Sequence, residues 1–285
     1  MLFKKIGFLV FLLPIVLFGM NPFFNGLNSG APLTFVNNPV GVYSFVQNPA
    51  LLDNQTQDFS FSYNVLYQEM GAMSIMAKIY NNKLFSLASG FQYIHYGAFS
   101  DNIQHYNMSA RQFVVGANFF LIPYFNFGVN LKYENELFLD SYNNAFSIDV
   151  GLFKSMKIKS SQIFLGLTMF NPVLISSTVL VSPDVHLAFG LERKFLNHDY
   201  SLNNQIISCN NFTQNSDVVN LSFFLYKSIK LKISNKFDSF SLFNPAFGLQ
   251  YSTKTLKNNI VINYAIQNVT SNLFQNSLNL YIKIN

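Results

Sequence analysis

The chain has 285 residues, of which half are hydrophobic and 17% are aromatic, while only 11% are charged. Soluble domains carry about 25% charged residues, so this composition disfavours a water-soluble protein. The net charge of +5 comes from scattered basic residues that form no long run, and this argues against nucleic acid as a partner. Cys209 is the only cysteine, which excludes an internal disulfide and a cysteine-cluster metal site.

Residues 1–20 have the pattern of a secretory signal peptide. Lys4 and Lys5 precede an apolar stretch over residues 6–18, and Gly19 is a small residue suited to cleavage. The alternative is an uncleaved membrane anchor. We therefore expect an exported protein from a bacterium with an outer membrane.

Residues 21–57 do not alternate and are rich in Asn, Pro and Gly. They contain the tripeptide Asn48-Pro49-Ala50. Pro49 fixes its own φ and restricts Asn48 to an extended backbone, while the Asn side chain can bond to nearby backbone groups. This combination predicts a rigid elbow that turns a plug, or hatch, into a barrel. The alternative is a plain loop before the first strand.

Residues 58–285 repeat one pattern. In residues 125–133 every odd position is apolar or aromatic and every even position is small or polar, so a strand here has one apolar and one polar face. The pattern recurs in segments of about ten residues, which suits transmembrane β-strands. We predict an all-β protein, an antiparallel transmembrane β-barrel of about 14 strands with an N-terminal plug. The predicted strands are 59–67, 73–80, 83–96, 107–120, 124–136, 145–154, 162–171, 184–194, 200–209, 218–227, 229–237, 244–253, 258–267 and 276–284.

The predicted connections run roughly long and short by turns, as external loops and periplasmic turns do in outer-membrane barrels. Residues 97–106 and 137–144 are among the predicted long loops. A secreted β-sandwich would also alternate apolar and polar residues. Its outward face should carry many charges, however, whereas these strands offer mainly Asn, Ser, Gly and Gln. The bacterial outer membrane is therefore the expected location.

Lys132 and Asp149 are predicted to form an ion pair in the lumen. If the connecting loop is centred near residue 140, an antiparallel register places Lys132 opposite Asp149 on the polar face. An opposite-charge cross-strand pair would help to fix that register. Glu134 lies two residues further along and could share the lysine. We interpret these residues as structural, not catalytic.

Several segments carry a resemblance to a known family. They are residues 48–51 (Asn-Pro-Ala-Leu), residues 90–97, residues 128–133 followed by residues 149–152, and residues 247–251 near the C-terminus. In these segments the chain resembles the PorV/PorQ family of outer-membrane proteins, which is related to the FadL-like fourteen-stranded barrels. FadL-like barrels pass hydrophobic molecules, with the N-terminal segment folded into the lumen as a hatch. PorV/PorQ proteins serve the type IX secretion system.

The resemblance implies two roles. The first is transport or a secretion-associated function without catalysis, with secretion-system components or secreted proteins as partners beside outer-membrane lipid. The second is a FadL-like channel for uptake of a hydrophobic small-molecule ligand. A third alternative, from another class of function, is a structural or adhesive surface protein. We expect no catalytic residue, cofactor or metal, because the four histidines are dispersed without metal-ligand spacing.

Overall fold

A computed structural model describes the protein over these residues: 42, 44–52, 58–67, 70–100, 105–121, 125–138, 141–159, 161–170, 173–176, 184–194, 198–209, 212–238, 244–254, 258–270 and 273–284. The predicted signal peptide, residues 1–20, and most of the predicted plug segment, residues 21–57, lie outside the described residues. No helix among the described residues is long and apolar enough to span a membrane.

The described residues form a fifteen-stranded sheet and two short helical turns. The helical turns are α3 (Ser44–Gln47) and η1 (Pro49–Leu51). The strands are β1 (Phe59–Tyr67), β2 (Met70–Asn81), β3 (Phe85–Ser100), β4 (His105–Leu121), β5 (Phe125–Phe138), β6 (Ser141–Ile158), β7 (Ser161–Phe170), β8 (Val173–Ser176), β9 (Asp184–Lys194), β10 (His198–Cys209), β11 (Phe212–Tyr226), β12 (Ile229–Asp238), β13 (Asn244–Lys254), β14 (Asn258–Thr270) and β15 (Leu273–Ile284).

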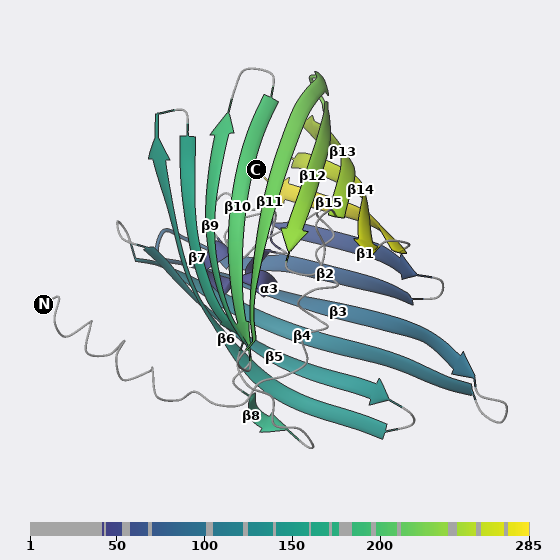
Figure 1. Ribbon diagram of the computed structural model, residues 1–285. Helices are drawn as coiled ribbons and strands as arrows, with labels where there is room; N and C mark the ends of the chain where they lie inside the picture. Colours follow the sequence, from purple (N-terminus) through teal and green to yellow (C-terminus); the bar gives the residue numbers. More distant parts are fainter. Residues whose placement is uncertain are drawn as a thin grey trace, which may run out of the picture.

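The sheet is antiparallel and closes on itself. The first strand pairs with the last, β1 with β15, and the remaining pairings lead around the ring through β5 and β6 (Figure 1). Closure removes the free sheet edges that cannot persist in lipid. Strand β8 lies beside β6 and was not predicted from the sequence. It continues the ladder that β7 begins on β6.

The predicted long loops at 97–106 and 137–144 are wrong, because the strands continue into them. Strand β3 extends to Ser100 and β4 begins at His105, while only two residues separate β5 from β6. Polar side chains near this end pair across the ladder: Tyr133 donates its hydroxyl to Asn144 Oδ1 at 2.8 Å, and Asn135 Nδ2 donates to the same oxygen at 2.8 Å. Residues that suggested a loop therefore stabilise strands.

On β4, β6, β13 and β14, exposed apolar residues alternate with buried residues. On β6, Phe146 is exposed while Ser147, Asp149 and Gly151 are buried, as the alternation predicts. Large hydrophobic side chains such as Val115 on β4 are likewise exposed on the outside of the ring. A closed barrel with an apolar exterior suits the hydrocarbon region of a bilayer.

A row of aromatic rings crosses four neighbouring strands near one rim. Ring centroids are 5.1 Å apart between Tyr80 and Phe85, 6.3 Å apart between Phe85 and Phe119, and 6.4 Å apart between Phe119 and Phe127. Tyr80 and Phe119 are also exposed. Aromatic belts of this kind lie at the membrane–water interface, so the row marks one boundary of the membrane-spanning region.

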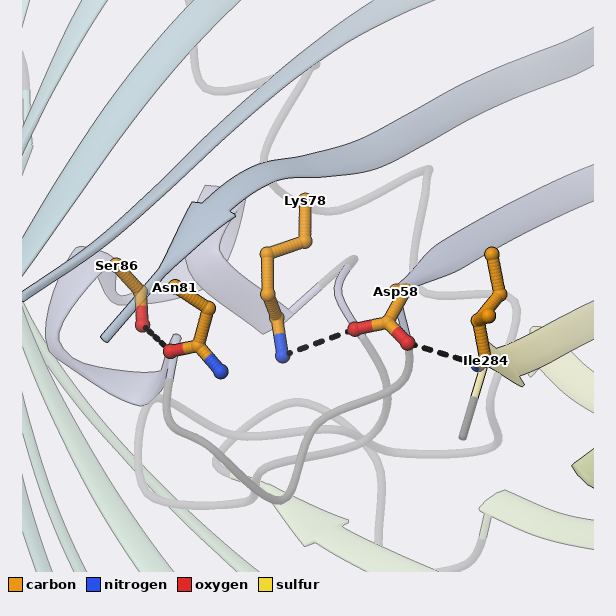
Figure 2. A network of polar contacts seen from close by, with 5 residues as sticks. All are labelled: Asp58, Lys78, Asn81, Ser86 and Ile284. Atoms are coloured by element: carbon orange, nitrogen blue, oxygen red, sulfur yellow. Dashed lines mark hydrogen bonds and ion pairs between the residues drawn. The ribbon is translucent and has the colours of Figure 1, made fainter. Parts of the chain in front are cut away.

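Asp58 joins the two ends of the barrel chain (Figure 2). Its backbone N–H donates to Ile282 O at 2.9 Å, and its carboxylate accepts a hydrogen bond from the Ile284 N–H at 2.8 Å. The same carboxylate lies 3.5 Å from Lys78 Nζ. Asp58, the residue before β1, therefore contacts both the end of β15 and the side chain of Lys78 on β2, at the place where the sheet closes.

Replacing Asp58 by Ala should weaken this closure. Asp58→Ala removes the acceptor for the Ile284 N–H and the carboxylate beside Lys78, whose side chain is only 2% exposed. We expect the free energy of unfolding to fall by about 1–2 kcal/mol, measured by urea titration in lipid vesicles. Asp58→Asn keeps an acceptor oxygen and should cost less. Equal stability of Asp58→Ala and the wild type would contradict this role.

Candidate functional site

Residues 44–52, here called the inner segment, lie against the inner face of the barrel wall. Every residue of this segment is buried. Its turn is built around Asn48, whose backbone is extended (φ −151°, ψ 110°) and whose side-chain oxygen accepts a hydrogen bond from the Ala50 N–H at 3.0 Å. Pro49 starts the helical turn that follows, a position where proline suits the backbone. The sequence thus forms a compact elbow from three adjacent residues.

Glycines on three adjacent strands make room for this elbow. Gly128 on β5 and Gly151 on β6 are direct partners in the register, and both are buried on the inner face. A Cβ atom at Gly128 would overlap the main chain of Pro49 and Ala50, and one at Gly151 would overlap the Asn48 side chain. On β4, a Cβ at Gly116 would meet the ring of Phe45. The close approach of the inner segment therefore requires glycine on the wall.

Carboxamide side chains of the wall hold the inner segment by its backbone. Asn118 Nδ2 donates to Leu52 O at 2.6 Å, and Asn130 Nδ2 donates to Phe45 O at 2.7 Å. In the reverse direction, Asn48 Nδ2 donates to Leu152 O of β6 at 3.1 Å. Neutral hydrogen bonds of this type contribute about 1 kcal/mol each. The contacts fix the segment without any ion pair among them.

Apolar side chains complete the contact. Two clusters of buried residues join the inner segment to the wall. The first contains Val42, Phe45, Val46 and Leu52 with Met76, Ala88 and Val114, and the second contains Ala50 and Leu51 with Phe153 and Phe164. A third cluster, Ala72, Ile94 and Ala110, belongs to the inner face of β2, β3 and β4 alone. Apolar side chains therefore line part of the inner wall on these strands, between buried polar ones.

Lys132 and Asp149 lie together on the inner face. Lys132 Nζ is 2.5 Å from Asp149 Oδ2, and both side chains are fully buried. The predicted direct opposition is wrong, because Lys132 is opposite Ser147 and Asp149 is opposite Asn130. The turn between Phe138 of β5 and Ser141 of β6 is centred one residue earlier than the predicted loop, so the register moves by two residues. A shift of two keeps both side chains on one face, and the long lysine reaches its diagonal neighbour.

Glu134 is also buried on this face, but its hydrogen bond comes from a strand that the sequence argument did not consider. Gln112 Nε2 on β4 donates to Glu134 Oε1, and the two residues are direct partners in the register. The sequence did not predict roles for Gln112, Asn118 and Asn130, because the predicted ion pair concerned β5 and β6 alone. Their only signal was their place on the polar face of alternating strands.

Solved structures resemble this fold, although no protein-family model and no curated protein matches the sequence. The toluene transporter TbuX of Ralstonia pickettii is 9% identical, with 93% of this chain and 97% of that chain covered and a TM-score of 0.59. The CymD monoaromatic hydrocarbon channel is 8% identical, with coverages of 94% and 97% and a TM-score of 0.57. The toluene transporter TodX of Pseudomonas putida is 10% identical, with coverages of 93% and 98% and a TM-score of 0.55.

The chain therefore has the fold of outer-membrane β-barrel channels. This fold, the closed sheet and the apolar exterior place the protein in the bacterial outer membrane. At 8–10% identity, the likeness to these structures concerns the fold. A specific relationship to PorV/PorQ proteins, and with it a partner in secretion, finds no support in these similarities.

Proposed function

We propose that this protein is an outer-membrane channel for uptake of hydrophobic small molecules, and that the inner segment is its hatch. The observation that carries the proposal is the set of large apolar side chains on the inner wall of β2, β3 and β4. General porins have a polar, water-filled interior, whereas β2, β3 and β4 present Ala72, Met76, Ile94 and Val114 to the inside of this barrel. A solute with little affinity for water gains more from such a wall than a sugar or an ion does.

The contacts of the inner segment suit a part that moves. Its hydrogen bonds to the wall are neutral, and the Asn126 donor lies as far as 3.4 Å from Ala50 O. Each of these bonds contributes about 1 kcal/mol, so release of the segment is opposed mainly by its buried apolar side chains. The names of the similar structures, toluene transporters and a monoaromatic hydrocarbon channel, agree with a hydrophobic cargo. Secretion-linked work, our leading expectation from sequence, has no comparable observation in its favour.

Uptake of labelled toluene by intact cells tests the proposal. Cells that produce the protein should take up toluene several-fold faster than cells with an empty vector, while uptake of a labelled sugar stays unchanged. Val114→Thr, which adds a hydroxyl to the inner wall at nearly constant volume, should slow toluene uptake. Val115→Thr alters the neighbouring exposed position and serves as the matched control. Toluene uptake equal to that of the empty vector would refute the channel.

A further inference from the structure

Polar side chains form an unbroken row around part of the inner wall. In the register, Asn263 is opposite Asn279, Asn279 is opposite Ser62, Ser62 is opposite Ser74, Ser74 is opposite Gln92, Gln92 is opposite Gln112, and Gln112 is opposite Glu134. All of these residues are buried. The row, here called the polar belt, runs across neighbouring strands from β14 through β15, β1, β2, β3 and β4 to β5.

On β2, β3 and β4, apolar residues lie on both sides of the belt. Two positions along these three strands in one direction are Ala72, Ile94 and Ala110, which form their own buried cluster. Two positions in the other direction are Met76 and Val114, which contact the inner segment. Because side chains on one face of a strand recur every second residue, these rows are adjacent levels of the same wall. A hydrophobic molecule at this wall would therefore meet the polar belt between two apolar levels.

The belt ends in a pair of hydrogen-bond acceptors. When Glu134 is ionised, its carboxylate can only accept, so the amide nitrogen of Gln112 faces Glu134 Oε1 and the amide oxygen faces away. Gln112 Oε1 and Glu134 Oε2 are buried and have no hydrogen-bond partner among the described residues. Gln112 is 0% exposed and Glu134 is 3% exposed. A buried acceptor without a donor costs about 1–3 kcal/mol, which a donor from a bound molecule would recover.

We propose that Gln112 and Glu134 bind the polar head of an amphiphilic solute, a hydroxyl or amino group that donates a hydrogen bond. The apolar body of the solute lies against the adjacent level of Ala72, Ile94 and Ala110. This inference rests on the proposed channel function and specifies its cargo. A carboxylate head is disfavoured because Glu134 repels it, and a plain hydrocarbon leaves both acceptors without a donor.

Binding measurements on the purified full chain in lipid nanodiscs test this site. Four probes share one body: p-ethylphenol and p-ethylaniline carry a donor, whereas p-ethylanisole and ethylbenzene carry none. Isothermal titration calorimetry should give affinities about tenfold higher for the two donors, since a hydrogen bond to a charged group contributes about 1.5–3 kcal/mol. Equal affinities for all four probes would overturn the polar-head site and leave the channel proposal standing. Failure of all four probes to bind would count against both.

Glu134→Gln is the decisive variant. It keeps the size of the side chain but places an amide N–H donor beside Gln112 in place of one acceptor. The preference for p-ethylphenol over p-ethylanisole should fall toward equality, while the affinity for ethylbenzene stays unchanged. Glu136→Gln removes the same charge two residues along β5 and should keep the preference. A Glu134→Gln protein that is folded and still prefers p-ethylphenol tenfold would refute the site.

Discussion

Gly128→Ala should drive the inner segment away from the barrel wall. The added Cβ would overlap the main chain of Pro49 and Ala50, and a main chain cannot rotate away as the end of a side chain can. Retreat of the segment would break the hydrogen bond from Asn118 to Leu52 O and expose Leu51, which is fully buried. Lost burial of one leucine alone costs about 1.5–3 kcal/mol. We expect backbone amides of residues 44–52 to exchange hydrogen at least about a hundredfold faster.

Hydrogen exchange with mass spectrometry provides the measurement, and a second glycine provides the control. Gly248 is also buried on the inner face, but a Cβ there would find its nearest neighbour at 3.5 Å, an ordinary contact. Gly248→Ala should therefore leave exchange of the inner segment unchanged. Unchanged protection of residues 44–52 in a folded Gly128→Ala protein would show that the elbow does not depend on the glycine wall.

Lys132→Met should destabilise the barrel strongly. The substitution removes the lysine that forms an ion pair with Asp149, a fully buried carboxylate, and Glu134 lies on the same face, two residues from Lys132. Removing one member of a buried pair typically costs about 3–5 kcal/mol, because the remaining charge has no compensation. Urea unfolding in lipid vesicles should give a decrease of this size.

Two further variants separate the charge effect from lost packing. Lys132→Met combined with Asp149→Leu removes both charges, so the double variant should recover most of the lost stability. Lys154→Met alters a lysine on the opposite face of β6, where surface substitutions change stability by about 0.5 kcal/mol or less. A Lys132→Met protein within about 1 kcal/mol of the wild type would contradict the importance of the pair.

The two faces of the barrel could be read from the sequence because their signal is local. Alternation at residues 146–152 assigned Phe146 to the outside and Ser147 and Asp149 to the inside, and the burial agrees. The approximate neighbours Lys132 and Asp149 followed from the same alternation. Their exact register did not, since it depends on the position of a turn whose flanking polar residues suit a strand as well as a loop.

The wall contacts of the inner segment could not be derived in the same way. In the sequence, Asn118 and Asn130 do not differ from other polar residues that face a lumen. Gly128 and Gly151 likewise do not differ from other small residues on that face. Their partners lie far away in the sequence, at Leu52, Phe45 and the elbow around Asn48. Such contacts depend on where the closed sheet brings its strands, which local patterns do not encode. The same reason applies to the polar belt, which spans both ends of the chain.

Locking the inner segment to the wall tests the hatch most directly. In a Cys209→Ser background, Asn48→Cys with Gly151→Cys places two thiols at a suitable separation, because a Cβ at position 151 would lie 3.0 Å from the present Asn48 Cγ. Asn48→Cys with Gly248→Cys is the matched pair and should form no disulfide. The measurement is toluene uptake by cells producing the cross-linked protein, before and after reduction. We expect uptake to be lost when the disulfide forms and restored by the reductant; full uptake by the cross-linked protein would contradict a channel opened by this hatch.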